Sequence, residues 1–105
     1  MTEAVVVLAV ITPAPGRLDE VRRVLLELVP KVHEEPGCER YALHERQDGA
    51  LVMIERYASQ QAFEAHGAGE NLKALRSSLD GLLTGPFDVS VLTPLPAGDP
   101  EKGSL

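Results

Sequence analysis

The sequence predicts a single α+β domain whose elements follow the order β-α-β-β-α-β, with a four-stranded antiparallel sheet and its helices on one face. The chain has 105 residues, a length that fits one domain. Four segments have the β-branched or alternating apolar pattern of strands, and two regions between them show helical spacing. An Asp-Gly pair between the second and third strand segments indicates a hairpin.

The composition is typical of a globular cytoplasmic protein. Hydrophobic residues make up 44% and charged residues 25% of the chain, which argues against disorder. The formal net charge is −6 and no basic block occurs, so neither nucleic acid nor an anionic membrane is predicted as a partner. The single cysteine excludes an internal disulfide and suits a reducing compartment. Residues 1–3 lack the positive charge of a signal peptide, and the apolar run 4–11 is too short to cross a bilayer.

The first strand and the first helix are predicted between residues 4 and 35. Residues 4–12 are apolar on both alternating faces, as in a strand that is buried on both sides. From Gly16 to Glu35 the apolar residues recur at helical spacing and form one stripe, namely Leu18, Val21, Leu25, Leu28 and Val32. Pro30 is expected to kink or break this helix, because it removes a backbone hydrogen bond and crowds the preceding turn.

A hairpin is predicted from residues 38–46 and 51–58. Its simplest connection is a two-residue type I′ turn at Asp48-Gly49. In that register one face carries Arg40, Ala42, His44, Met53, Glu55 and Tyr57, and the other carries Tyr41, Leu43, Val52 and Ile54. A three-residue loop would instead place Arg40 opposite Arg56, which is a like-charge pair. The two-residue turn is therefore the preferred prediction.

The last third of the chain predicts a helical region and a final strand. Ser59 is a suitable N-cap for a short helix through Ala62, Phe63 and His66, which residues 67–69 (GAG) interrupt. A second amphipathic piece is expected to continue until Gly85-Pro86, with Leu72, Leu75, Leu79, Leu82 and Leu83 on one side. The alternation of Phe87, Val89 and Val91 predicts a strand. The domain is thus expected to span residues 1–95, and residues 96–105 (PAGDPEKGSL) to form a flexible tail.

This order of elements is the ferredoxin-like plan. Helices cover only one face of such a sheet, whereas the first strand is apolar on both faces. The uncovered face therefore needs an apolar partner, and a second copy packed about a two-fold axis supplies one. The sequence predicts a homodimer.

Three blocks of residues resemble the antibiotic biosynthesis monooxygenase (ABM) family: residues 35–41 (EPGCERY), residues 55–57 (ERY) with 62–66 (AFEAH), and residues 82–86 (LLTGP). The resemblance covers roughly residues 4–95. It implies that two sheets form a dimeric α+β barrel, as in the quinol monooxygenases of this family. It also implies oxidation of a small aromatic or quinone-like ligand. The chain departs from the family pattern at Tyr57, where tryptophan is common, and at Asn71, where a second histidine often occurs.

His66 is the principal catalytic candidate, because a neutral imidazole can remove a proton from a phenol or hydroquinone. The resulting anion can reduce dioxygen directly, so no cofactor is predicted. Tyr57 and Glu55 lie two residues apart on one strand face and are candidates to bind a substrate oxygen and to orient His66. The candidates for substrate binding are Asn71, His44 and Phe63. For each, an ordinary structural role stays open: His66 as the end of its helix, Tyr57 as packing, and Asn71 as an N-cap.

Other functions are also compatible with the sequence. No metal site is predicted, since His33, Cys38 and His44 do not have a zinc-ligand spacing, and Cys38 is expected to pack as a small apolar residue. Haem binding is disfavoured, because the haem-degrading relatives use an Asn in the first strand and a Trp, and this chain has neither. A non-redox isomerase that uses the same histidine, and a dimeric ligand-binding accessory protein, are the two alternatives to a monooxygenase.

Overall fold

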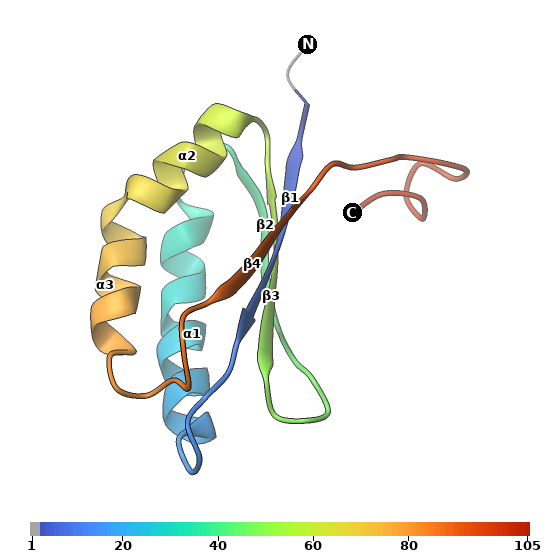
Figure 1. The fold of residues 1–105 in the computed structure, drawn as a ribbon. Helices are drawn as coiled ribbons and strands as arrows, with labels where there is room; N and C mark the ends of the chain where they lie inside the picture. Colours follow the sequence, from blue (N-terminus) through green and yellow to red (C-terminus); the bar gives the residue numbers. More distant parts are fainter. Residues whose placement is uncertain (1–2) are drawn as a thin grey trace.

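The computed structural model describes residues 3–105. Its elements in chain order are β1 (Val5–Ile11), α1 (Leu18–His33), β2 (Cys38–Glu45), β3 (Leu51–Tyr57), α2 (Gln60–Ala68), α3 (Glu70–Ser78) and β4 (Asp88–Leu92). The strands form one antiparallel sheet in the order β2-β3-β1-β4. The helices all pack on one side of the sheet, and the segment after β4 extends from the other side (Figure 1). The predicted ferredoxin-like α+β fold is confirmed.

The hydrophobic core lies between the sheet and the helices. Val7, Ala9 and Ile11 of β1 point into it, as do Leu51 and Met53 of β3. The opposite side of the sheet, here called the open face, carries the alternate residues Val6, Leu8, Val10, Val52 and Ile54. No helix in residues 3–105 has both the length and the apolar character needed to span a membrane.

Helix α1 is continuous through Pro30, so of the predicted kink or break the break does not occur. Pro30 lies in the last turns of the helix, and the carbonyl that it leaves without a donor belongs to Leu26, which is 53% exposed. Water can satisfy that carbonyl. The buried stripe on either side, Leu25, Leu28 and Val32, stabilises the helix by roughly 1.5–3 kcal/mol per side chain. Together these contacts outweigh the cost of about 3 kcal/mol for an internal proline.

The β2–β3 hairpin uses a three-residue loop, so the predicted two-residue turn and its register are wrong. The Arg46 N–H donates to the carbonyl of Ala50, and Gly49 adopts φ +92°. The Asp48 carboxylate accepts from the Ala50 N–H at 3.1 Å, which stabilises this longer loop. Arg40 therefore does pair with Arg56, but Glu39 offsets the like charges, because its carboxylate accepts from Arg56 Nε at 2.8 Å.

This register decides which side chains face the helices. Tyr41 pairs with Glu55 and Leu43 with Met53, and Glu55 and Met53 are buried on the helix side of β3. His44 pairs with Val52 and lies on the open face. The hairpin thus carries Tyr41 toward the core with Met53 and Glu55 and places His44 on the other face, whereas the predicted register grouped His44 with Met53 and Glu55.

Helices α2 and α3 meet at Gly69. The hydroxyl of Ser59 accepts from the Ala62 N–H at 3.2 Å, as predicted for an N-cap. Helix α3 ends at Ser78 instead of continuing to Leu83, because the next residues bond to the chain after β1. The Leu82 carbonyl accepts from the Ala14 N–H at 2.8 Å, and the Thr84 N–H donates to Thr12 at 3.0 Å. These hydrogen bonds, with an isolated antiparallel bridge between Pro13 and Leu83, tie the turn after α3 to the chain after β1.

Candidate functional site

A small, mostly apolar chamber lies between the sheet and helices α2 and α3. Its volume is about 150 Å³. Apolar side chains form most of its wall, among them Val7, Ala9, Met53, Phe63, Leu75 and Phe87. The polar or charged side chains in the wall are Tyr41, Glu55, His66 and Arg76. A cavity of this size holds a single aromatic ring, since benzene binds in engineered apolar cavities of about 150 Å³.

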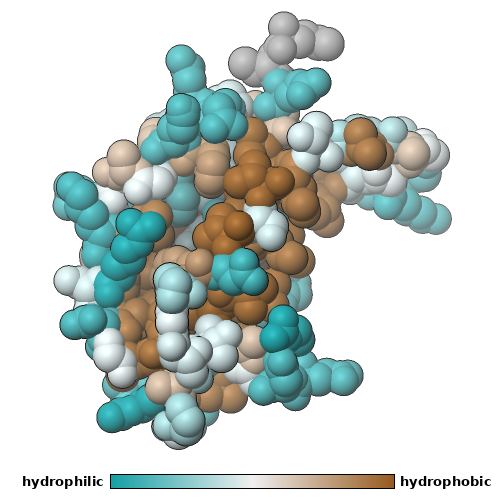
Figure 2. Space-filling view, viewed as in Figure 1, coloured by the Kyte–Doolittle hydropathy of each residue, from teal (hydrophilic) through white to brown (hydrophobic). Residues whose placement is uncertain are grey.

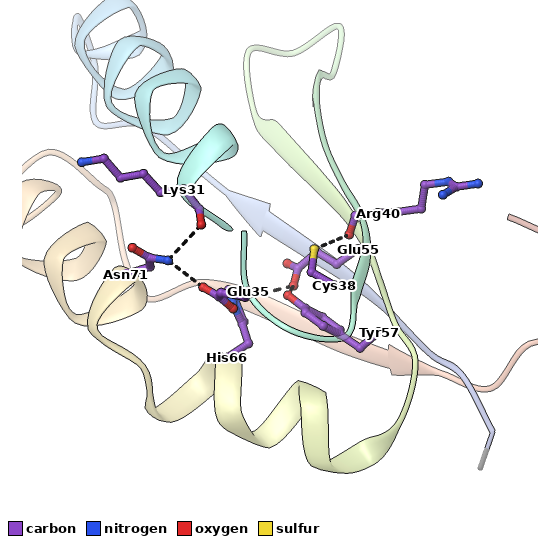
Figure 3. A network of polar contacts seen from close by, with 8 residues as sticks. All are labelled: Lys31, Glu35, Cys38, Arg40, Glu55, Tyr57, His66 and Asn71. Atoms are coloured by element: carbon purple, nitrogen blue, oxygen red, sulfur yellow. Dashed lines mark hydrogen bonds and ion pairs between the residues drawn. The ribbon is translucent and has the colours of Figure 1, made fainter. Parts of the chain in front are cut away.

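His66 lies in the wall between this chamber and a shallower hollow on the outside of α2. Helix α2 begins at the Ser59 cap and ends at Gly69, which places His66 in its last turn. The imidazole is 5% exposed. Its Nδ1 lies 2.8 Å from Glu35 Oε1, and its Nε2 lies 3.9 Å from Glu55 Oε1 (Figure 3). An ionised carboxylate only accepts hydrogen bonds, so Nδ1 is the donor in this contact, and a ring that carries its proton at Nδ1 alone leaves Nε2 as an acceptor.

Besides His66, the side-chain amide of Asn71 also donates a hydrogen bond to the Glu35 carboxylate. Asn71 Nδ2 lies 2.8 Å from Glu35 Oε2 and 3.3 Å from the Lys31 carbonyl. Each oxygen of the Glu35 carboxylate therefore accepts one hydrogen bond, from His66 and from Asn71 (Figure 3). Asn71 is the second residue of α3 rather than its N-cap, which is Gly69, so the predicted cap is wrong. Its side chain instead ties the end of α1 to α3.

Glu55 and Tyr57 form a second buried pair on β3. The Tyr57 hydroxyl donates to Glu55 Oε1 at 2.6 Å, and the two side chains share the helix side of the strand. Burial raises the pKa of the Glu55 carboxyl above its ordinary value, while the Tyr57 hydrogen bond and the nearby His66 imidazole oppose this rise. Burial and the adjacent Glu55 raise the pKa of the Tyr57 hydroxyl, so it stays a donor.

Tyr41 completes the polar side of the chamber. It is 4% exposed, and its ring centroid lies 5.6 Å from that of His66. Burial raises the pKa of its phenol, and the carboxylates of Glu55 and Glu35 raise it further. A phenol in this position is a hydrogen-bond donor for an oxygen atom that enters the chamber.

The structure brings together four of the six residues proposed for the site. His66, Glu55 and Phe63 line the chamber, and Tyr57 lies directly behind them, 5.2 Å from the His66 ring and 5.7 Å from the Phe63 ring. Asn71 lines the outer hollow and reaches His66 only through Glu35. His44 is exposed on the open face, where its Nδ1 lies 3.1 Å from the Ala42 carbonyl.

Sequence reasoning missed Glu35, Tyr41 and Arg76. Glu35, and not Glu55, is the carboxylate within hydrogen-bond distance of His66. Glu35 is the first residue of the 35–41 block that resembles the family, but nothing in the sequence indicated that it contacts His66. Tyr41 would have been found with the three-residue loop register, which sets it beside Glu55. No local pattern marks Arg76, which is one of several charges on α3.

Replacing Glu55 with glutamine should change how stability depends on pH. The folded state holds the Glu55 proton more tightly than the unfolded state, so the free energy of unfolding falls as pH rises from about 4.5 through the raised pKa. Glu55→Gln keeps an acceptor for Tyr57 and removes this fall. We expect urea unfolding to show the variant gaining stability over the wild type between pH 4 and 7. Glu64→Gln, at an exposed α2 position, is the control, and a pH-independent difference for Glu55→Gln would contradict the argument.

Comparison with known proteins gives consistent matches. The sequence profile of the family described as antibiotic biosynthesis monooxygenase matches residues 4–77. The Mycobacterium tuberculosis protein named "Putative monooxygenase Rv0793" is 36% identical over 96 residues, which cover 90% of this chain and 95% of that protein. The solved structure of Rv0793 superposes with a TM-score of 0.83 at 34% identity and covers 91% of this chain and 99% of that one. The crystal structure of PA3566 from Pseudomonas aeruginosa superposes with a TM-score of 0.82 at 29% identity, and the match covers 90% of this chain and 97% of that one. Since the profile spans most of the domain and Rv0793 agrees over nearly the whole length of both chains, this chain belongs to the antibiotic biosynthesis monooxygenase family.

Proposed function

We propose that this protein is a cofactor-independent monooxygenase that oxidises a small quinol-like aromatic substrate with dioxygen. One observation carries the proposal: the His66 imidazole is fixed by Glu35 at Nδ1, while its ring borders an apolar chamber with room for one aromatic ring. The family and the printed name of Rv0793 support the reaction class. The substrate and the mechanism are our inference from the side chains.

In this mechanism the substrate ring occupies the chamber and its hydroxyl faces His66 Nε2. The imidazole removes the phenolic proton, and Glu35 stabilises the charged ring that results. The Tyr41 hydroxyl donates to the developing oxyanion, and Tyr57 holds Glu55 in place behind it. The electron-rich anion then reduces dioxygen. For hydroquinone the balanced outcome is a hydroxyquinone and water: one oxygen atom enters the ring, the other leaves as water, and the substrate supplies the electrons.

Oxygen consumption with hydroquinone tests this proposal. In air the protein should consume one dioxygen per hydroquinone converted, above the rate of spontaneous oxidation in buffer, and under nitrogen the substrate should remain unchanged. Conversion under nitrogen would instead identify a non-redox enzyme such as an isomerase. Binding without conversion in air would identify a ligand-binding accessory protein.

We also propose that two copies pack through their open faces to form a dimeric α+β barrel. The open face carries the apolar residues Val6, Leu8, Val10, Val52 and Ile54, and no helix covers it (Figure 1). An apolar strip of this kind is stable in water when a like surface covers it. We expect the wild-type protein to sediment at the mass of two copies, and Ile54→Arg to sediment as one. A wild-type protein that sediments as a single copy would contradict this arrangement.

A further inference from the structure

The chamber is connected to a second, more open space on the surface of the molecule. This space is an open groove of about 450 Å³ formed by the end of α3 and the segment 79–89. Three residues, Arg76, Phe87 and Val89, line both the chamber and the groove. Apolar residues gather over β4 and beside α3 on this side of the molecule, with hydrophilic residues around them (Figure 2). A substituent on a ring in the chamber can therefore reach the boundary with the groove, where Arg76 lies.

Arg76 is the charged residue at this junction. It is exposed, and within residues 3–105 its guanidinium forms no ion pair, as is also the case for Arg23 and Arg40, whereas the other four arginines each pair with a carboxylate. Of the three arginines without an ion pair, Arg76 is the one that lines the chamber. Asp80 follows one turn later and lines the groove, but it makes no ion pair with Arg76 and does not line the chamber. A guanidinium without a partner at the mouth of an apolar chamber has its hydrogen-bond donors available for a ligand.

We propose that Arg76 binds an anionic substituent of the substrate, so that the preferred substrate is a single-ring quinol carrying a carboxylate. This inference rests on the proposed function. The ring occupies the chamber with its reacting hydroxyl toward His66, and the carboxylate lies at the mouth against the guanidinium. Arginine suits this role because its planar fork can donate two parallel hydrogen bonds to a carboxylate.

The other charges around the chamber are compatible with this orientation. The carboxylate in the chamber wall, Glu55, is buried on β3, whereas Arg76 is exposed at the mouth on α3. Burial disfavours the ionised form of Glu55, which reduces its repulsion of an anionic ligand. His66 in its protonated form would attract the same anion, but its Nδ1 is already bonded to Glu35. Arg76 is thus the permanent positive charge in the wall.

Anaerobic calorimetry with two matched ligands tests the proposal. The ligands are 2,5-dihydroxybenzoate and its neutral methyl ester, and the proteins are the wild type, Arg76→Gln, Arg76→Lys and Arg23→Gln. Arg23 is an exposed arginine on α1 that lines neither the chamber nor the groove, so it controls for net charge. We expect the wild type and Arg23→Gln to bind the acid about tenfold more tightly than the ester. Arg76→Gln should bind the two ligands equally, and Arg76→Lys should keep part of the preference.

Two results would overturn the assignment of Arg76. One is equal binding of acid and ester by the wild type, and the other is a preference that survives in Arg76→Gln. Either result leaves the proposed function intact, because oxygen consumption by the wild type with hydroquinone tests that function separately. Failure of the wild type to bind either ligand would overturn the proposal for Arg76, and failure to oxidise hydroquinone as well would overturn the monooxygenase.

Discussion

The His66→Ala protein is expected to lose hydroquinone-dependent oxygen consumption by roughly 10²–10⁴-fold in kcat, the usual contribution of a general base. In the proposed mechanism Nε2 of His66 is the base and Glu35 orients it, and alanine offers no proton acceptor at this place in the chamber wall. The measurement is oxygen consumption per protein at saturating hydroquinone, corrected for spontaneous oxidation.

The matched control for this experiment is His44→Ala. His44 is exposed on the open face, so its replacement removes an imidazole without touching the chamber. Because His66 is buried against Tyr41 and Tyr57, a second variant, His66→Gln, keeps most of the side-chain volume and a donor for Glu35. Full turnover in either His66 variant, with a circular dichroism spectrum like that of the wild type, would rule out His66 as the base.

The Glu35→Gln protein is expected to lose roughly 10²-fold in kcat, with a smaller change in KM. Glu35 is a positioning residue: its two oxygens accept from His66 Nδ1 and from Asn71 Nδ2. A glutamine has one oxygen for these two donors, so its NH₂ group must face one of them. When it faces His66, Nδ1 becomes the acceptor and Nε2 carries the proton. The imidazole then has no free site for the substrate proton.

Two readouts separate this effect from a general structural one. The ¹⁵N chemical shifts of the His66 ring report which nitrogen carries the proton, and they should reverse in Glu35→Gln. The double variant Glu35→Gln with Asn71→Asp should recover part of kcat, because the glutamine NH₂ can then face a carboxylate and its oxygen can face His66. Glu34→Gln, an exposed neighbour, is the control. An unchanged tautomer together with wild-type kcat in Glu35→Gln would show that Glu35 does not position the base.

The parts of the fold that depend on local patterns were predictable. The apolar periodicity of residues 4–12, the stripe of α1 and the cap at Ser59 occur as expected, and the interruption predicted at residues 67–69 is confined to Gly69, because α2 continues through Ala68. Such features depend on residues within about one turn or one strand of each other, where propensity and burial act together. Two errors, at Pro30 and at the end of α3, arose because contacts with distant segments outweighed the local preference.

The sequence by itself determined the order of the elements, the apolar sides of strands and helices, and the choice of His66, Glu55 and Phe63 as residues near one site. Only the tertiary structure decided that Glu35 meets His66 across 31 positions, that Tyr41 faces Glu55, and that Arg76 stands at the mouth of the chamber. The reason is physical. The periodicity of apolar side chains depends on residues that are close in the sequence. The register of a hairpin and the packing of helices on the sheet depend instead on small free-energy differences between alternative loops and packing arrangements. One residue more in the hairpin loop placed Tyr41 on the same face as Glu55, whereas the predicted register placed the two on opposite faces.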